Sequence, residues 1–203
     1  AIDLIEITPR VDGVTAILKK FGVLKDEFAE PKALACPVRD GKAWFADRIP
    51  IPLYPNLGTI STMPPEGYKP SYAGAYGGDF DQKDVGVGSR VHLPVIHPGA
   101  QVFFADPHAV ISDGIISGTG IECSASVRAR IGLNKSIKLD RPIIEHGINE
   151  LVERQVRPPP RSIDCKEAEH GRRQVPQMGI AVGHRFVGLL GCSVKGHLRL
   201  DPL

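Results

Sequence analysis

Several patterns that would assign this chain to a familiar class are missing from its 203 residues. No apolar run approaches the roughly 18 to 20 residues that a membrane-spanning helix needs. The first residues, AIDLIEI, lack the basic and apolar regions of a signal peptide. The net charge is +2, and the basic residues are scattered along the chain, so there is no support for binding to nucleic acid or to an anionic membrane. We therefore expect a soluble enzyme domain with neither of these partners.

The chain also lacks the usual signs of cysteine and serine chemistry. Its four cysteines form no C-x-x-C pair and are too sparse for a secreted disulfide scaffold, which favours reduced thiols in a cytoplasmic protein. There is no G-x-S-x-G nucleophile elbow, and Cys123 has no evident base beside it. A mechanism with a serine or cysteine nucleophile is therefore disfavoured. The cysteines are Cys36, Cys123, Cys165 and Cys192.

Glycine (22 residues) and proline (18 residues) are abundant and divide the chain into short segments. Proline breaks helices and glycine weakens them, so long helices are hard to fit around these residues. The segments between them are β-branched and read as short strands. We predict a mainly β fold, a sandwich or barrel-like pair of sheets, with the proline-rich residues 36–76 largely as loop and edge wrapped over a sheet. The expected strands lie in residues 1–7, 89–96, 100–105, 109–122 and 125–133.

Only the C-terminal part invites helices. Ile148, Leu151, Val152 and Val156 follow helical spacing before a run of three prolines. We expect helix mainly within residues 147–175, in a small C-terminal α+β segment. The predicted organisation is a β-rich body at 1–146 with 147–203 as a segment of the same domain.

Carboxylates and one histidine gather on glycine-punctuated segments between residues 77 and 122. Hard carboxylate oxygens with one imidazole suit zinc or another divalent cation. Asp106 and His108 are two residues apart, so on a strand they share a face and can point at one ion. Other readings stay open, because Asp106 before a proline and Asp113 before a glycine are also common turn signals. The candidate residues are Asp81, Asp106, His108, Asp113 and Glu122.

Glu122 and Lys83 each have two possible readings at this stage. Glu122 ends the apolar run GIISGTGI, where an unpaired buried carboxylate would be costly, so it is either exposed at a strand end or has a cationic partner. Lys83 has a functional reading, in which it holds a carboxylate or polarises an amide. Its other reading is a solvated loop lysine.

The order of these residues resembles the acetamidase/formamidase family of amide hydrolases. The similarity is carried by GG-D-F-D-x-K-D from Gly77, G-S-x-V-x-L-P-V from Gly88, D-x-H-A from Asp106 and G-T-G-I-E ending at Glu122. It extends upstream through residues 9–28 and 48–67 and covers roughly the first 145 residues. The resemblance implies hydrolysis of a small amide such as formamide or acetamide, self-association into homo-oligomers, and a C-terminal helix followed by a closing strand. Family members also carry sequence ahead of Ala1, so this chain is expected to be a processed form, a fragment or a partial sequence.

The resemblance also implies roles for the candidate residues. Asp81, Asp106 and His108 would hold a divalent metal, zinc first and calcium as the alternative. Glu122 or Asp113 would accept a proton from water and return it to the leaving amine, and Lys83 is the third candidate catalytic residue. The N–H groups near Gly77 and Gly78 would steady the oxyanion.

The chain departs from the family pattern at several positions. The family motif D-G-E reads Asp113-Gly114-Ile115 here, and isoleucine can neither act as a base nor orient water. Two alternatives to a linear amidase therefore stay open: a non-catalytic β-rich ligand-binding or structural relative, and a cyclic-amide (lactam) hydrolase. The other departures are Asp79, Phe80, Ala105 and Ile111.

Overall fold

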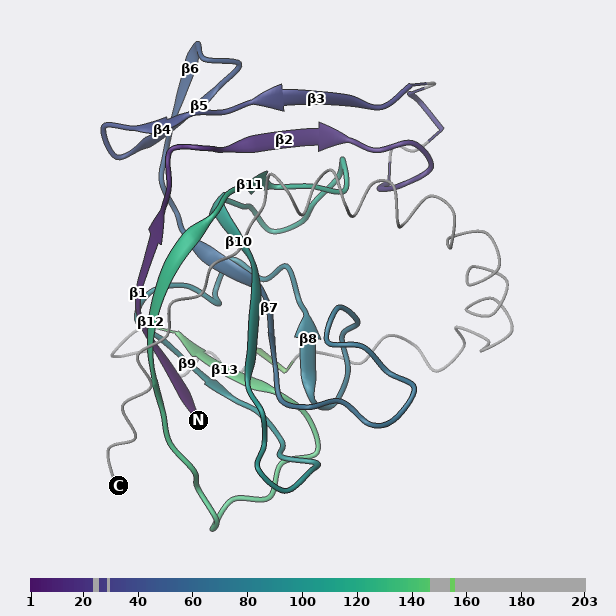
Figure 1. The fold of residues 1–203 in the computed structure, drawn as a ribbon, viewed down its shortest axis with the longest axis vertical. Helices are drawn as coiled ribbons and strands as arrows, with labels where there is room; N and C mark the ends of the chain where they lie inside the picture. The colour runs from purple at the N-terminus through teal and green to yellow at the C-terminus, as the bar shows by residue number, and fades with distance from the viewer. Residues whose placement is uncertain (24–25, 29, 147–153, 156–203) are drawn as a thin grey trace.

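The computed structural model describes residues 1–23, 26–28, 30–146 and 154–155 (Figure 1). These residues form fourteen β-strands joined by turns and loops, and they contain no helix. The mainly β prediction is therefore confirmed for this part of the chain. Within the same residues, no helix is long and apolar enough to cross a membrane.

The strands form three sheets, and every strand pairing is antiparallel. The five-stranded sheet has the order β12 (Ala125–Ile131), β1 (Ile2–Pro9), β9 (Ser89–His92), β13 (Ile143–His146) and β14 (Arg154–Gln155). The six-stranded sheet has the order β3 (Lys32–Ala35), β2 (Val14–Ile17), β11 (Ile121–Glu122), β10 (Phe103–Val110), β7 (Asn56–Ser61) and β8 (Gly77–Asp79). The three-stranded sheet is β4 (Val38–Arg39), β5 (Lys42–Phe45) and β6 (Ile49–Pro52).

The main hydrophobic core joins the five-stranded sheet to β7 of the six-stranded sheet. Ile2 and Leu4 alternate inward along β1, and a bulge between Leu4 and Glu6 shifts this alternation so that Ile7 is the next buried residue. A bulge adds one residue to one strand and so re-aims the side chains that follow it. The core also contains Leu57, Ile60, Val85, Val91, Leu93, Ala125 and Ile144. Its effect is to hold β7 firmly beneath the site described below.

A smaller core joins the three-stranded sheet to β10 and β11. It is built from small and medium side chains, including two buried cysteines. Cys165 and Cys192 lie outside the described residues. The members of this smaller core are Cys36, Val38, Ala43, Ala109, Ile121 and Cys123.

The prediction that residues 36–76 are largely loop and edge holds for most of this range but misses the central strand β7. This range contains β4, β5 and β6, and it also contains β7, all six residues of which are buried between β10 and β8. A strand covered on both faces shows no alternation of apolar and polar residues, and the prolines flanking β7 concealed it.

Other expected strands are present with changed limits. Residues 1–7 and 125–133 correspond to β1 and β12, and 89–96 forms a strand only at β9. The segment 100–105 becomes a strand only from Phe103, and the residues between β10 and β11 form a loop. The prediction of helix within residues 147–175 is wrong at Arg154–Gln155, because these two residues pair with β13 as a strand. The rest of residues 147–203 lies outside the described residues.

Candidate metal centre

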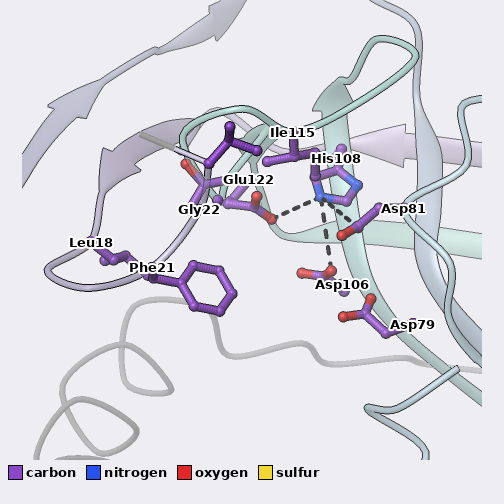
Figure 2. A pocket seen from close by; sticks show the side chains of 12 residues that line it. Leu18, Phe21, Gly22, Asp79, Asp81, Asp106, His108, Ile115 and Glu122 are labelled. Carbon is purple, nitrogen blue, oxygen red and sulfur yellow. Dashed lines mark ion pairs between the residues drawn. The ribbon is translucent and has the colours of Figure 1, made fainter. Parts of the chain in front are cut away.

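The predicted site residues converge on the central strands of the six-stranded sheet. Asp106 and His108 come from β10, and Glu122 of β11 stands opposite His108 in the strand register. Asp81 follows β8 by two residues. These side chains line one end of a cavity of about 490 Å³, where they surround the His108 ring (Figure 2).

The side chains are close enough to share one cation. His108 Nε2 lies 3.2 Å from Glu122 Oε2, 3.7 Å from Asp81 Oδ1 and 3.8 Å from Asp106 Oδ2. One ligand atom each from Asp81, Asp106 and His108 can be chosen so that all three lie within 4.8 Å of one another. The structure therefore brings together the three residues predicted to hold a metal.

The backbone is held in an unusual conformation at two of these residues. Asp81 has φ of 46° and Asp106 has φ of 57°, in the left-handed region that few residues other than glycine adopt. Such conformations cost on the order of 1–3 kcal/mol each and occur where the surrounding structure holds them in place. The surroundings here are β7 and β8, which direct both carboxylates into the cluster.

Gly58 on β7 forms the floor of the cluster and was not predicted from the sequence. It stands opposite Asp106, between the register pairs Ala105↔Thr59 and Pro107↔Leu57. A Cβ atom at Gly58 would lie 2.5 Å from Asp106 Oδ2, 2.8 Å from Asp81 Oδ1 and 2.8 Å from His108 Cε1. Only glycine leaves room for these three side chains to meet.

Asn56 fixes the orientation and the tautomer of His108, and this residue was also missed. Its Nδ2 donates to the Gln82 carbonyl oxygen at 3.0 Å, which leaves Asn56 Oδ1 as an acceptor. His108 Nδ1 is 3.1 Å from that oxygen and donates to it, so the lone pair of the neutral ring is on Nε2, facing the carboxylates. His108 is only 1% exposed. Partners of this kind orient metal-binding histidines.

Without a cation, the cluster favours bound protons. Burial, together with the neighbouring carboxylates, raises the pKa of Asp81 to about 6 and that of Asp106 to about 7. Burial also raises the pKa of Asp79, which lines the same end of the cavity. Burial alone lowers the pKa of His108, but the hydrogen bond and charge of Glu122, followed by Asp106 and Asp81, raise it above its ordinary value.

These observations show that the residues fit a divalent cation. Asp81 Oδ1 is buried and has no hydrogen-bond partner, although buried polar atoms are nearly always paired. His108 Nε2 faces the same place, and a cation there would offset the repulsion among the carboxylates. The chemistry of this donor set suits a metal better than an unoccupied ion-pair cluster.

Glu122 is part of the cluster rather than an exposed strand end. It is 8% exposed, and its Oε1 accepts a hydrogen bond from the Gly120 N–H at 2.7 Å. Its second oxygen faces His108 Nε2. Of the two readings open from the sequence, the structure agrees with the one in which Glu122 has a partner.

The other predicted residues lie apart from this cluster. Lys83 and Asp113 form an ion pair of 2.6 Å with each other, and neither lines the cavity. Gly77 and Gly78 do not line it either, and the Gly77 N–H donates to the Gly74 carbonyl oxygen at 3.1 Å. The close approach of β8 to the Ile60 backbone and to the Tyr72 carbonyl explains why glycines are needed there. The catalytic and oxyanion roles of these four residues stay predictions.

The rest of the cavity lining is mostly apolar. Its side chains come from the loop after β2 and from the loop between β10 and β11, and Figure 2 shows Phe21 and Leu18 across from the carboxylates. We call this surface the apolar wall and define it as Leu18, Phe21, Val23 and Ile115. Ile115 was singled out in the sequence as a departure from the family motif. The other three gave no signal, because they follow no motif and lie on a loop.

A sequence profile of the Acetamidase/Formamidase family matches residues 54–197 of this chain. The match covers more than half of the chain, and the chain therefore belongs to this family. A comparison with curated proteins gives no significant match.

Solved structures agree with this assignment. An acetamidase from Bacillus halodurans is 27% identical with a TM-score of 0.68, and the match covers 71% of this chain and 50% of that one. A predicted acetamidase/formamidase from Thermoanaerobacter tengcongensis is 27% identical with a TM-score of 0.69, covering 71% and 48%. A gamma lactamase from Delftia acidovorans, 18% identical with a TM-score of 0.66, covers 74% and 52% and shares the fold. The chain thus spans about half the length of the structures it matches.

Proposed function

We propose that this chain hydrolyses small neutral amides, with formamide and acetamide as the simplest examples, to a carboxylate and ammonia. The observation that carries the proposal is the convergence of Asp81, Asp106 and His108 Nε2 at one end of a cavity, with Glu122 beside them. Membership of the family supports the same reaction.

Asp81, Asp106 and His108 would hold the metal, for which we propose zinc. Calcium prefers six to eight oxygen ligands, whereas zinc readily takes imidazole together with carboxylates, so His108 favours zinc. Such an ion, when bound, lowers the pKa of a water molecule towards ~7 and polarises a carbonyl oxygen.

Glu122 is our candidate for the proton-transfer residue. Its carboxylate lines the cavity, while Asp113, the other candidate, is paired with Lys83 outside it. Glu122 would accept a proton from water as the carbonyl carbon is attacked and would donate it to the nitrogen as the C–N bond breaks. The Gly120 N–H, which donates to Glu122 Oε1, holds this carboxylate in place.

The direct test measures ammonia release from formamide and acetamide. Activity should disappear after dialysis against a chelator and return on addition of zinc, and His108→Ala should be inactive and bind no metal. His92→Ala is the matched control, because His92 pairs with Glu145 at 3.0 Å and does not line the cavity. Chelator-resistant activity, or an active His108→Ala variant, would contradict the proposal.

The second candidate function is a non-catalytic binding or structural role. It is favoured by Ile115, which lines the cavity where the family motif has a glutamate. An Ile115→Glu variant separates the two. Increased hydrolysis in that variant would show an intact site that lacks this carboxylate, whereas no ammonia from either form would favour binding alone. A lactam added to the same assay tests the cyclic-amide alternative.

We further propose that the chain forms homo-oligomers and functions in the cytoplasm without nucleic-acid or membrane partners. Exposed sheet edges invite pairing with another chain, and β3 is an edge strand of the six-stranded sheet. Sedimentation of a stable monomer would contradict the first of these proposals.

A further inference from the structure

We propose that the apolar wall binds an apolar substituent of the amide, so that the preferred substrates are neutral amides that carry an alkyl chain or ring. This inference rests on the proposed amide hydrolysis and specifies its substrate class. Formamide and acetamide would then be minimal substrates that leave the wall in contact with water.

The wall is a defined structure, because its two loops are bonded to each other. The Val23 N–H donates to the Ile116 carbonyl oxygen at 2.9 Å. The Thr119 hydroxyl accepts from the Ala16 N–H at 2.8 Å and donates to the Ala16 carbonyl oxygen at 2.9 Å. These bonds tie the loop between β10 and β11 to β2 and to the loop that follows it.

Two glycines let these loops interlock. Gly118 has φ of 91°, and a Cβ atom there would overlap the Phe21 ring, so the ring packs directly on the Gly118 backbone. Gly22 has φ of 79°, and its Cβ would lie 2.7 Å from the Ser117 carbonyl carbon. Phe21 remains 55% exposed although its ring is fixed in this way. A fixed, exposed aromatic side chain at a cavity is suited to contact a ligand.

The distribution of charge determines what the wall can bind. Among the twelve residues that line this cavity in the described part of the chain, none is lysine or arginine. The ionisable ones are four acidic residues and one histidine: Asp79, Asp81, Asp106, His108 and Glu122. A ligand with a polar amide near these residues and an uncharged apolar group at the wall matches both surfaces, whereas an anionic substituent would find no partner.

The size of the cavity agrees with this reading. Ligand pockets commonly have volumes of ~300–1,000 Å³, and the volume here is about 490 Å³. A one-carbon or two-carbon amide fills a small part of such a space. Each methylene buried against the wall should raise kcat/KM by roughly 4-fold, following the usual transfer free energy of a CH₂ group.

The test compares kcat/KM for acetamide, hexanamide and N-pentylformamide. The last two are isomers that place the chain on the carbonyl carbon and on the nitrogen, so the better one shows which side of the amide faces the wall. We expect at least one of them to exceed acetamide by about 10-fold or more. Phe21→Ala should lower the ratio of that substrate to acetamide by about 10-fold, and Ile115→Ala gives a second, independent variant. Leu133→Ala, at an exposed leucine outside the cavity, should leave the ratio unchanged.

Direct binding separates this inference from the proposed function. Saturation-transfer NMR with hexanamide needs no turnover, and the signal from its methyl group should weaken in Phe21→Ala. If no amide is hydrolysed but this binding and its loss are seen, the apolar subsite stands and the proposed reaction is wrong. If amides are hydrolysed without any gain from acetamide to either isomer, or if Phe21→Ala lowers all substrates equally, the inference is overturned.

Discussion

The two ends of the cavity are built on different parts of the fold. The end that carries the carboxylates and His108 is built on and beside β7, β8, β10 and β11, and His108 there is 1% exposed. The apolar end is carried by two loops, and Phe21 and Val23 are 55% and 78% exposed. Under the proposed function, the sheet would fix the chemistry and the loops would set the range of substrates. Loops can change without disturbing a scaffold, which is why binding residues often occur on them.

The largest effect should come from filling the floor of the metal-binding end. Gly58→Ala places a methyl group 2.5 Å from Asp106 Oδ2 and 2.8 Å from Asp81 Oδ1, so the ligands must separate. We expect metal affinity to fall by about 100-fold or more, on the scale at which disturbed ligand geometry acts, with the circular dichroism spectrum still that of a β protein.

Gly114→Ala is the matched control for this change. A Cβ atom at Gly114 meets no atom within 4 Å, and its φ is not in the left-handed region. Equal zinc affinities of the two variants in a competition titration would show that Gly58 is not the floor of a metal site.

The next effect separates proton transfer from metal binding. Glu122→Gln removes the carboxylate but keeps a side chain of the same shape beside His108. If Glu122 transfers the proton, turnover should fall by roughly 10² while metal content stays near one ion per chain. If the same variant loses its metal, Glu122 is a ligand. Elemental analysis alongside the ammonia assay distinguishes the two results, and unchanged activity with unchanged metal would remove Glu122 from the mechanism.

A smaller effect on metal affinity is expected at Asn56, which contacts His108 and not the proposed metal. Asn56→Ala removes the acceptor for His108 Nδ1 and the amide that is anchored on the Gln82 carbonyl oxygen. Loss of such an orienting partner typically costs 10-fold to 100-fold in metal affinity. Isothermal titration with zinc measures it, and an affinity within 2-fold of wild type would mean that Asn56 does not orient the ring.

The sequence predicted one end of the cavity much better than the other. Asp81, Asp106, His108 and Glu122 were found because hard ligands on glycine-rich segments form a chemical pattern that needs no knowledge of the fold. Gly58 and Asn56 were missed because they lie in a buried strand without alternation, where a glycine or an asparagine looks like an ordinary breaker. Their roles depend on strand register, which brings Gly58 opposite Asp106 and Asn56 opposite His108.

Tertiary contacts also explain why the limits of β7 and the residues of the apolar wall were not predicted. The β-rich class followed from the density of glycine and proline, but the limits of β7 depend on which sheets cover it. Phe21 and Val23 could not be connected with Ile115, because their proximity arises from a contact between loops almost a hundred residues apart in the sequence. The ion pair of Lys83 with Asp113 is likewise a product of tertiary structure.

The smallest effect is a dependence of stability on pH. An unfolded aspartate loses its proton near pH 4, whereas folded Asp81 keeps its proton to about pH 6 and folded Asp106 to about pH 7. The folded metal-free protein then binds more protons than the unfolded chain, so its free energy of unfolding falls as the pH rises. The raised pKa of His108 acts in the same direction. We expect the metal-free protein to melt at a lower temperature at pH 8 than at pH 5, and saturating zinc to remove this difference. Melting curves of the metal-free form that rise with pH would contradict the electrostatics described for the cluster.

The most direct test of the central claim is the position of the metal itself. Crystals of the protein grown with zinc, with diffraction data collected on both sides of the zinc absorption edge, should give one anomalous peak per chain in contact with Asp81, Asp106 and His108 Nε2. A peak elsewhere, or no peak at these three residues in zinc-saturated crystals, would contradict the account.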